Sequence, residues 1–204
     1  MDLLVRPATP EDACVPLLLE SARPYYAAYA GGEQRARRML DAVYAKTGHA
    51  ASYEICTVAL LDGEIVGLVA GFPVAEADER SRRFVRLTLP ALPLWRWPGT
   101  FRHLHAAGAV APAPPVDAYY VDALAVAETH RRRGIARRLL EIADAQAREA
   151  GLPRLALDTG LQNAGARALY ESFGFGEREI RRARNRRTAR ALGGPGFVGY
   201  LKTL

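Results

Sequence analysis

Cysteine is scarce in this chain, which has two such residues among 204. Cys14 and Cys56 each lie among apolar residues, and neither has a Cys-x-x-Cys partner or a nearby pair of histidines. This pattern argues against a disulfide scaffold and against a zinc site built from thiolates. We therefore expect two buried free thiols and no bound metal.

A long apolar run is also missing. The first twelve residues lack the basic segment and the apolar core of a secretory signal. Elsewhere no apolar stretch approaches the roughly 20 residues that a membrane-spanning helix needs. The sequence therefore predicts a cytoplasmic protein without membrane contact.

Lysine occurs only at positions 46 and 202, so almost all of the 28 basic residues are arginines. The formal net charge of +6 favours an acidic ligand, nucleic acid or an anionic surface. So strong a preference for arginine can also reflect the coding composition of a genome. We interpret the charge as favouring a polyphosphate ligand, and we regard nucleic acid as an unlikely partner.

Half of the residues are apolar, so the chain is expected to form one domain over positions 1–204. A short strand is predicted at residues 3–6. The segment Thr9-Pro10-Glu11-Asp12 offers a helix cap, a helix-compatible proline and two acids. A helix is therefore predicted to begin there and to end no later than Pro24.

A second helix is predicted over residues 33–46, and strands are predicted over 53–61 and 64–72. Asp62-Gly63 separates the two strands and is a strong hairpin signal. Between the two helices lie Tyr25, Tyr26 and Tyr29. We favour packing at the helix junction for these tyrosines, with substrate contact as the alternative.

The segment 74–117 combines frequent prolines with many large apolar residues. It cannot form one regular element, and it is too apolar to remain solvated, so we expect short helices that cover another surface. His103 and His105 lie in this segment. Either could act as a base near neutral pH, although exposed or hydrogen-bonded histidines are more common.

The segment 119–136, YYVDALAVAETHRRRGIA, changes from an apolar run to a basic loop and then to an amphipathic stretch. This order predicts a buried central strand, a tight loop and a helix over 134–150, followed by a parallel strand at 154–158. Asp122 interrupts the strand, and its acid group is unexpected there. Two interpretations remain open for it: a catalytic base, or a structural acid that pairs with an arginine or caps the backbone.

The loop that opens this helix has the features of an anion-binding site. Backbone N–H groups at a loop-to-helix junction have no intrahelical acceptor, and the helix dipole adds partial positive charge. Gly134 allows an unusual backbone conformation, and Ala136 keeps bulk away. Additional cationic groups come from the arginines at positions 131, 132, 133, 137 and 138.

The spacing Arg131-x-x-Gly134-x-Ala136 resembles the pyrophosphate loop of the GNAT (GCN5-related N-acetyltransferase) family, Gln/Arg-x-x-Gly-x-Gly/Ala. A second match follows in the expected order. Asn163-x-x-Ala166-x-x-Leu169-Tyr170, followed by Phe173-Gly174-Phe175, resembles the family signature Asn-x-x-Ala-x-x-Leu-Tyr-x-x-x-Gly-Phe. Offsets of four and seven residues also place Asn163, Arg167 and Tyr170 on one face of a predicted helix.

The resemblance implies an α/β (α+β) fold with a mixed, mostly antiparallel sheet of about seven strands flanked by helices. It also implies an N-acetyltransferase that uses acetyl-CoA as the acyl donor and a primary amine of a small molecule or peptide as the acceptor. Tyr170 would be the general acid and Asp122 the general base. The residues expected to bind the cofactor are Leu124, Ala125, Val126, Arg131, Arg132, Arg133, Gly134, Ile135, Ala136, Arg137, Asn163 and Arg167.

In that setting, segment 74–117 is an insertion that either walls the acceptor pocket or forms a subunit contact, so a homodimer is possible. A catalytically silent CoA-binding module is the main alternative function. The run of arginines from 181 to 190 raises the further alternative of a nucleic-acid binder. That run lacks interleaved aromatics, so we interpret it as a solvated loop between edge strands.

Overall fold

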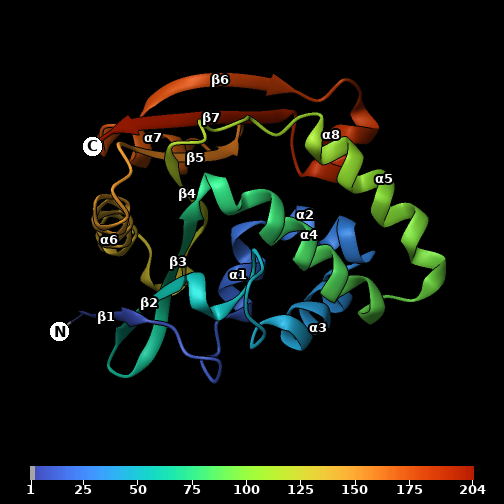
Figure 1. Cartoon of the computed structure of the whole chain (residues 1–204), viewed down its shortest axis with the longest axis horizontal. Helices are drawn as coiled ribbons and strands as arrows, with labels where there is room; N and C mark the ends of the chain where they lie inside the picture. The colour runs from blue at the N-terminus through green and yellow to red at the C-terminus, as the bar shows by residue number, and fades with distance from the viewer. Residues whose placement is uncertain (1–2) are drawn as a thin grey trace.

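The computed structural model describes residues 3–204, in which a seven-stranded sheet carries helices on both faces (Figure 1). The strand order is β1-β2-β3-β4-β5-β7-β6. Only β4 and β5 run parallel, so the predicted mixed, mostly antiparallel sheet is confirmed. The strands are β1 Leu3–Pro7, β2 Cys56–Leu61, β3 Glu64–Pro73, β4 Ala118–Val126, β5 Arg154–Gly160, β6 Gly176–Arg182 and β7 Gly196–Thr203.

Two hydrophobic cores lie on opposite faces of this sheet. On one face α6 packs against β2, β3, β4 and β5, and on the other α1 packs against β3 and β4. None of the helices within residues 3–204 is long and apolar enough to cross a membrane. The helices are α1 Val15–Ser21, α2 Arg23–Ala30, α3 Glu33–Val43, α4 Ala77–Thr88, α5 Trp97–Gly108, α6 Ile135–Glu149, α7 Ala164–Ser172 and α8 Arg186–Leu192.

The prediction that the first helix starts at residues 9–12 is wrong. The carboxylate of Asp12 accepts from the guanidinium of Arg6 at 2.7 Å and from the backbone N–H of Thr9 at 2.7 Å. These two contacts fix a turn, and α1 begins only at Val15. The interval between the predicted helices is itself helical, because α2 covers all three tyrosines of that interval.

The helix that follows the basic loop is confirmed as α6, and β5 follows it in parallel with β4. Gly67 of β3 allows α6 to lie close to the sheet. A Cβ atom at that position would stand 3.0 Å from side-chain carbons of both Ile135 and Leu139. The predicted hairpin also forms, although β2 begins at Cys56 after one turn of 3-10 helix at Tyr53–Ile55.

Segment 74–117 forms two helices, as predicted, with short 3-10 turns around them. α4 packs on α3, and α5 packs on α2 (Figure 1). His103 of α5 is 5% exposed and its ring lies 4.7 Å from that of Tyr25, whereas His105 is exposed. Segment 74–117 therefore packs over α2 and α3.

The arginine run near the C-terminus is solvated, as predicted, but it is not a single loop. Arg181 and Arg182 belong to the edge strand β6, and residues 186–192 form α8. The side chain of Asn185 caps α8 by accepting from the N–H of Thr188 at 2.9 Å. An asparagine at this position is a favoured helix cap, which is a local signal for the start of α8.

The sheet opens between β4 and β5. Their ladder covers only four pairs and ends at Val121 opposite Leu157. Beyond this point β4 continues along β3, with a bulge at Asp122, while β5 continues along β7 to Gly160. The β5-facing edge of β4 therefore has no strand partner after Val121.

Candidate functional site

The loop before α6 presents a row of unpaired backbone donors. Arg132 has φ 63° and Gly134 has φ 80°, so two residues in this short loop are left-handed. Across the described residues, no acceptor is found for the N–H groups from Arg132 to Arg137, and the first bond of the helix is donated by Arg138 to Gly134. Such a nest at a helix N-terminus is suited to binding an anion such as a phosphate.

The arginine side chains of this loop have different roles. Arg131 donates to the carbonyl of Val126 at 3.1 Å and to Glu20 at 3.0 Å, so it ties the loop to β4 and to α1. Arg132 is exposed and lines the cavity beside the loop. Arg137 also lines the cavity and lies over the ring of Phe173 at 5.5 Å. Arg133 is exposed but does not line the cavity.

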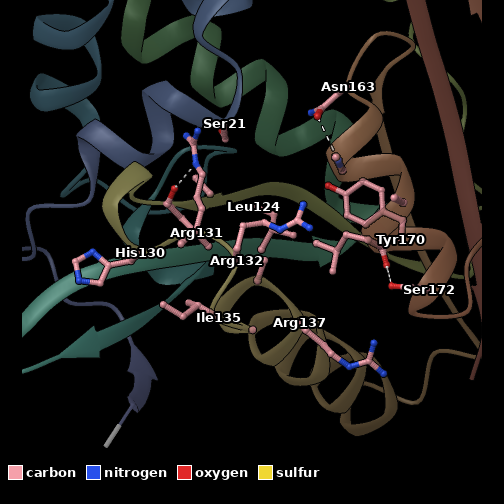
Figure 2. A pocket seen from close by; sticks show the side chains of 18 of the residues that line it. Ser21, Leu124, His130, Arg131, Arg132, Ile135, Arg137, Asn163, Tyr170 and Ser172 are labelled. Carbon is pink, nitrogen blue, oxygen red and sulfur yellow. Dashed lines mark hydrogen bonds between the residues drawn. The ribbon is translucent and has the colours of Figure 1, made fainter. Parts of the chain in front are cut away.

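A cavity of about 800 Å³ extends from this loop along the open edge of β4. Leu124, Ala125 and Val126 form one wall, and α7 forms the opposite wall (Figure 2). This volume lies at the upper end of the range for pockets that bind small molecules and cofactors. The cavity therefore joins an anion-binding end to a strand edge with free backbone groups.

Asn163 and Tyr170 both lie on the α7 side of the cavity (Figure 2). Asn163 caps α7, because its Oδ1 accepts from the N–H of Ala166 at 3.2 Å, and its Nδ2 donates to Thr159 at 3.2 Å. Tyr170 is 7% exposed and packs edge-on against Phe175 and Tyr200. Within the described residues its hydroxyl has no hydrogen-bond partner.

Burial raises the pKa of Tyr170 above the ordinary value for a phenol, and the nearby carboxylate of Asp158 adds to the shift. The phenol is therefore protonated at neutral pH. A buried hydroxyl that faces a cavity and carries its proton is able to donate that proton to a group inside the cavity.

Arg167 does not share the cavity with Asn163 and Tyr170. Its guanidinium pairs with Glu177 at 2.6 Å and donates to the hydroxyl of Tyr200 at 3.2 Å, so it points toward β6 and β7. Its side chain is therefore directed away from the cavity where the cofactor was expected. Helical spacing fixes the direction of the Cα–Cβ bond, but the end of a long side chain follows its partners.

Asp122 lies next to the cavity but outside its lining, on the side of β4 that faces α2. No described residue donates a hydrogen bond to it or forms an ion pair with it. The structural interpretation of this acid, which needed an arginine or a backbone donor, is thus not supported. The groups whose titration it affects include Tyr25 and Tyr26 of α2 and Tyr120 of β4.

The side chain of Asp122 has an exposed surface, although β4 is the central strand and has helices packed on both faces. Helices α1 and α6 pack against β4 from opposite faces, so we attribute the titration of Asp122 to its depth in the fold and not to the accessible area of its side chain. Burial, together with the nearby carboxylate of Asp158, raises the pKa of Asp122 to about 7. This carboxylate is therefore able to accept a proton at neutral pH.

Sequence reasoning missed part of the cavity wall. Glu20 and Ser21 of α1 reach it from the far N-terminal side, and no local pattern marks them as site residues. Asp158, which lies outside the cavity lining, ends the predicted strand over 154–158, and no sequence pattern marks it as a site residue. The other lining residues that were not predicted are His130, Gly165, Ala166, Ala168, Leu169 and Ser172.

The two cysteines are buried free thiols, as the sequence predicts. Cys14 and Cys56 are buried, free and outside the cavity lining. Burial raises the pKa of the Cys14 thiol to about 11. In the part of the chain that the structure describes, no group of three or more His, Cys, Asp or Glu side chains is arranged to hold a metal ion.

Comparison with known proteins places this arrangement in a family. The model of the acetyltransferase (GNAT) family matches residues 16–175. Comparison with the functionally curated proteins gives no match.

Solved structures share the fold along the whole chain. An N-acetyltransferase from Staphylococcus aureus Mu50 is 15% identical, with a TM-score of 0.69 over 97% of this chain and 99% of that chain. Another acetyltransferase is 23% identical, with a TM-score of 0.68 over 98% of both chains. A GNAT family acetyltransferase from Elizabethkingia anophelis, with acetyl-CoA bound, is 15% identical, with a TM-score of 0.55 over 99% of this chain and 98% of that chain. The family model spans most of the sequence and these structures show the same fold, so the chain belongs to the acetyltransferase (GNAT) family.

Proposed function

We propose that this protein is an N-acetyltransferase that transfers an acetyl group from acetyl-CoA to a primary amine by direct attack within a ternary complex. One observation carries the proposal: the unpaired N–H groups from Arg132 to Arg137 open onto a cavity whose far wall holds the protonated phenol of Tyr170. The acetyl-CoA in the Elizabethkingia anophelis relative supports the choice of donor.

The residues present fit an acyl-CoA. The loop around Gly134 would receive the diphosphate, with Arg132 and Arg137 adding positive charge. The free edge of β4 at Leu124, Ala125 and Val126 would pair with the pantetheine arm as an additional strand. This placement brings the thioester toward the part of the cavity that Tyr170 lines.

The proposed proton transfers are opposite in direction. Asp122 takes a proton from the acceptor ammonium, directly or through one water, and the resulting amine attacks the acetyl carbon of the thioester. The new C–N bond forms, the C–S bond breaks, and the hydroxyl proton of Tyr170 passes to the departing sulfur. The nitrogen loses its second proton, which returns through water to the Tyr170 phenolate, and Asp122 releases its proton to solvent. Cys14 and Cys56 lie in the core, so neither is positioned to carry the acetyl group between two half-reactions.

The proposal is tested by calorimetry and by a transfer assay on the same preparation. CoA should bind, and pantetheine, which lacks the diphosphate, should bind at least about tenfold more weakly because the loop donors remain unpaired. Acetyl-CoA with a panel of primary amines should release free thiol. Well-folded protein without affinity for CoA would overturn the proposal, and CoA binding without transfer to any amine would favour the silent binding module.

A further inference from the structure

A second carboxylate lies at the point where the sheet opens. Val121 and Leu157 form the last pair of the β4–β5 ladder. Asp122 follows Val121 on β4, and Asp158 follows Leu157 on β5. The hydroxyl of Tyr120 donates to Oδ2 of Asp158 at 2.5 Å, which fixes that carboxylate in place. Two acids on neighbouring strands therefore stand side by side at the start of the opening.

Neither acid has a cationic partner among the described residues, although the chain contains 28 basic residues. Ion pairs neutralise acids elsewhere in the fold, such as Asp12 with Arg6 and Asp144 with Lys202. Arg178 lines a small recess together with Asp158, but its guanidinium donates to the carbonyl of Ala113. The negative charge at the opening thus has no counterpart in the protein itself.

The acid pair lies close to the reacting groups. The carboxylate of Asp158 adds to the raised pKa of both Asp122 on β4 and Tyr170 on α7. Tyr25, Tyr26 and Tyr120 surround the pair with aromatic rings that bear no charge at neutral pH. The open edge of β4 therefore has two acids at its start, beside the cavity, and the basic loop of α6 at its other end.

We propose that Asp158, held by Tyr120, binds a second cationic group of the acceptor, so that the preferred acceptors are compact diamines or amines with an equivalent second positive charge. The inference depends on the proposed transfer to amines. Once Asp122 has taken the proton from the reacting amine, Asp158 still carries a negative charge that only the acceptor can balance. Neighbouring strands lie about 4.8 Å apart, so the second cation stands within a few bonds of the reacting nitrogen.

The same charge works against acceptors that carry a carboxylate. An amino acid would bring a third negative charge to a partly desolvated site with two acids and no cation, and like charges in such a site repel strongly. Free amino acids are therefore expected to be poor acceptors.

A series of acceptors with the same four-carbon chain tests the inference: putrescine, butylamine, aminobutanol and γ-aminobutyrate. The far end of these molecules is positive, apolar, neutral polar and negative, respectively. With saturating acetyl-CoA, kcat/KM for putrescine should exceed that for butylamine by about tenfold or more, which corresponds to one charge-assisted hydrogen bond. γ-Aminobutyrate should be the poorest acceptor.

The Asp158→Asn variant keeps an oxygen that can accept from Tyr120 and removes the charge. It should reduce the putrescine-to-butylamine ratio to about threefold or less, mainly through a higher KM for putrescine. It should also move the acidic limb of the pH profile to lower pH, because Asp158 no longer raises the pKa of Asp122. Glu149→Gln, an exposed acid on α6, removes the same charge far from the opening and should leave both readouts unchanged.

Equal kcat/KM for putrescine and butylamine would overturn the inference while leaving the proposed transfer intact. The same conclusion follows if Asp158→Asn lowers both values by the same factor. If CoA binds and no amine of any charge is acetylated, the proposed transfer fails and the inference fails with it.

Discussion

Two side chains carry the proposed chemistry, and each depends on being surrounded by protein. Burial keeps the proton on Tyr170 and raises the pKa of Asp122 to about 7, so one group is ready to donate and the other is near the midpoint of its titration at neutral pH. In water a phenol and an aspartate would differ by about six pKa units. The protein therefore determines these roles through depth and through the shared neighbour Asp158.

Replacing Tyr170 with phenylalanine should lower kcat by about a hundredfold or more, because the departing sulfur loses its proton donor. The affinity for CoA, measured by calorimetry, should remain within about twofold, since the loop donors are untouched. Tyr119→Phe is the matched control: this buried tyrosine donates to Gln146 on α6, away from the cavity. Unchanged turnover in the Tyr170 variant would remove the acid role.

The pH profile tests Asp122. A base works only when ionised, so the rate should rise by about tenfold per pH unit below pH 7 and level off above the pKa of about 7 that burial gives this acid. In Asp122→Asn that limb should disappear and the plateau should fall by about a hundredfold. An acceptor amine titrates well above this range, so its own limb is common to both proteins. A limb near pH 7 that persists in the variant would assign the base to another residue.

At the scale of elements, helix α6 has a left-handed glycine at each end. Gly134 precedes it with φ 80°, Gly151 follows it with φ 68°, and neither would bring a Cβ atom within 4 Å of another group. Alanine at either position is therefore opposed only by the backbone conformation, at a cost of about 1–2 kcal/mol. The two sites differ because Gly134 lines the cavity and Gly151 does not.

Gly134→Ala and Gly151→Ala should therefore lower the free energy of unfolding by similar amounts, about 1 kcal/mol each. Only Gly134→Ala should weaken CoA binding, by about tenfold or more, because relaxation of the strained residue turns N–H groups away from the diphosphate. Denaturant unfolding and calorimetry give the two quantities. Equal loss of CoA affinity in both variants would show that stability, and not loop geometry, determines binding.

The elements differ in how well the sequence predicts them. The loop and α6 were predictable because glycine, arginine and the amphipathic pattern each indicate local backbone behaviour. The start of α1 was not, since Asp12 binds Arg6 of the preceding strand instead of capping a helix. The position of Arg167 depends on Glu177 and Tyr200, and the bulge at Asp122 depends on β3. Such contacts between distant segments leave no periodic trace in the sequence.

At the scale of the whole molecule, opposite charges lie at the two ends of the open edge of β4. Arginines gather at the loop of α6, whereas Asp122 and Asp158 lie beside the cavity where the sheet opens, and neither forms an ion pair among the described residues. Other arginines pair with acids away from this edge, such as Arg23 with Glu20, Arg80 with Glu54 and Arg154 with Asp117. A net charge of +6 thus says little about the local charge where the sheet opens, because two acids lie there.

Segment 74–117 packs on α2 through His103, a buried polar side chain without a hydrogen-bond partner among the described residues. Both ring nitrogens of His103 lack hydrogen bonds, and its ring packs on Tyr25 and Tyr29 of α2. Burial, with a smaller effect from the charge of Arg96, lowers the pKa of His103 to about 4. The contact between α5 and α2 is therefore stable only while this imidazole remains neutral.

Stability should consequently depend on pH through His103. The pKa of His103 is about 6.5 in the unfolded chain and about 4 in the folded protein. Stability is therefore unaffected by this group above pH 6.5, and it decreases as the pH falls from 6.5 toward 4 because the unfolded chain binds the proton more readily. Between pH 7.5 and pH 5 the wild type should lose about 2 kcal/mol more than His103→Phe, as measured by urea unfolding at each pH. Asp122 and the other acids titrate alike in both proteins, so their contributions cancel in the difference.

The control His105→Phe changes an exposed histidine of the same helix and should follow the wild type. Parallel curves for wild type and His103→Phe would mean that this imidazole is hydrated or paired in solution, and that α5 does not dock on α2 through a neutral ring.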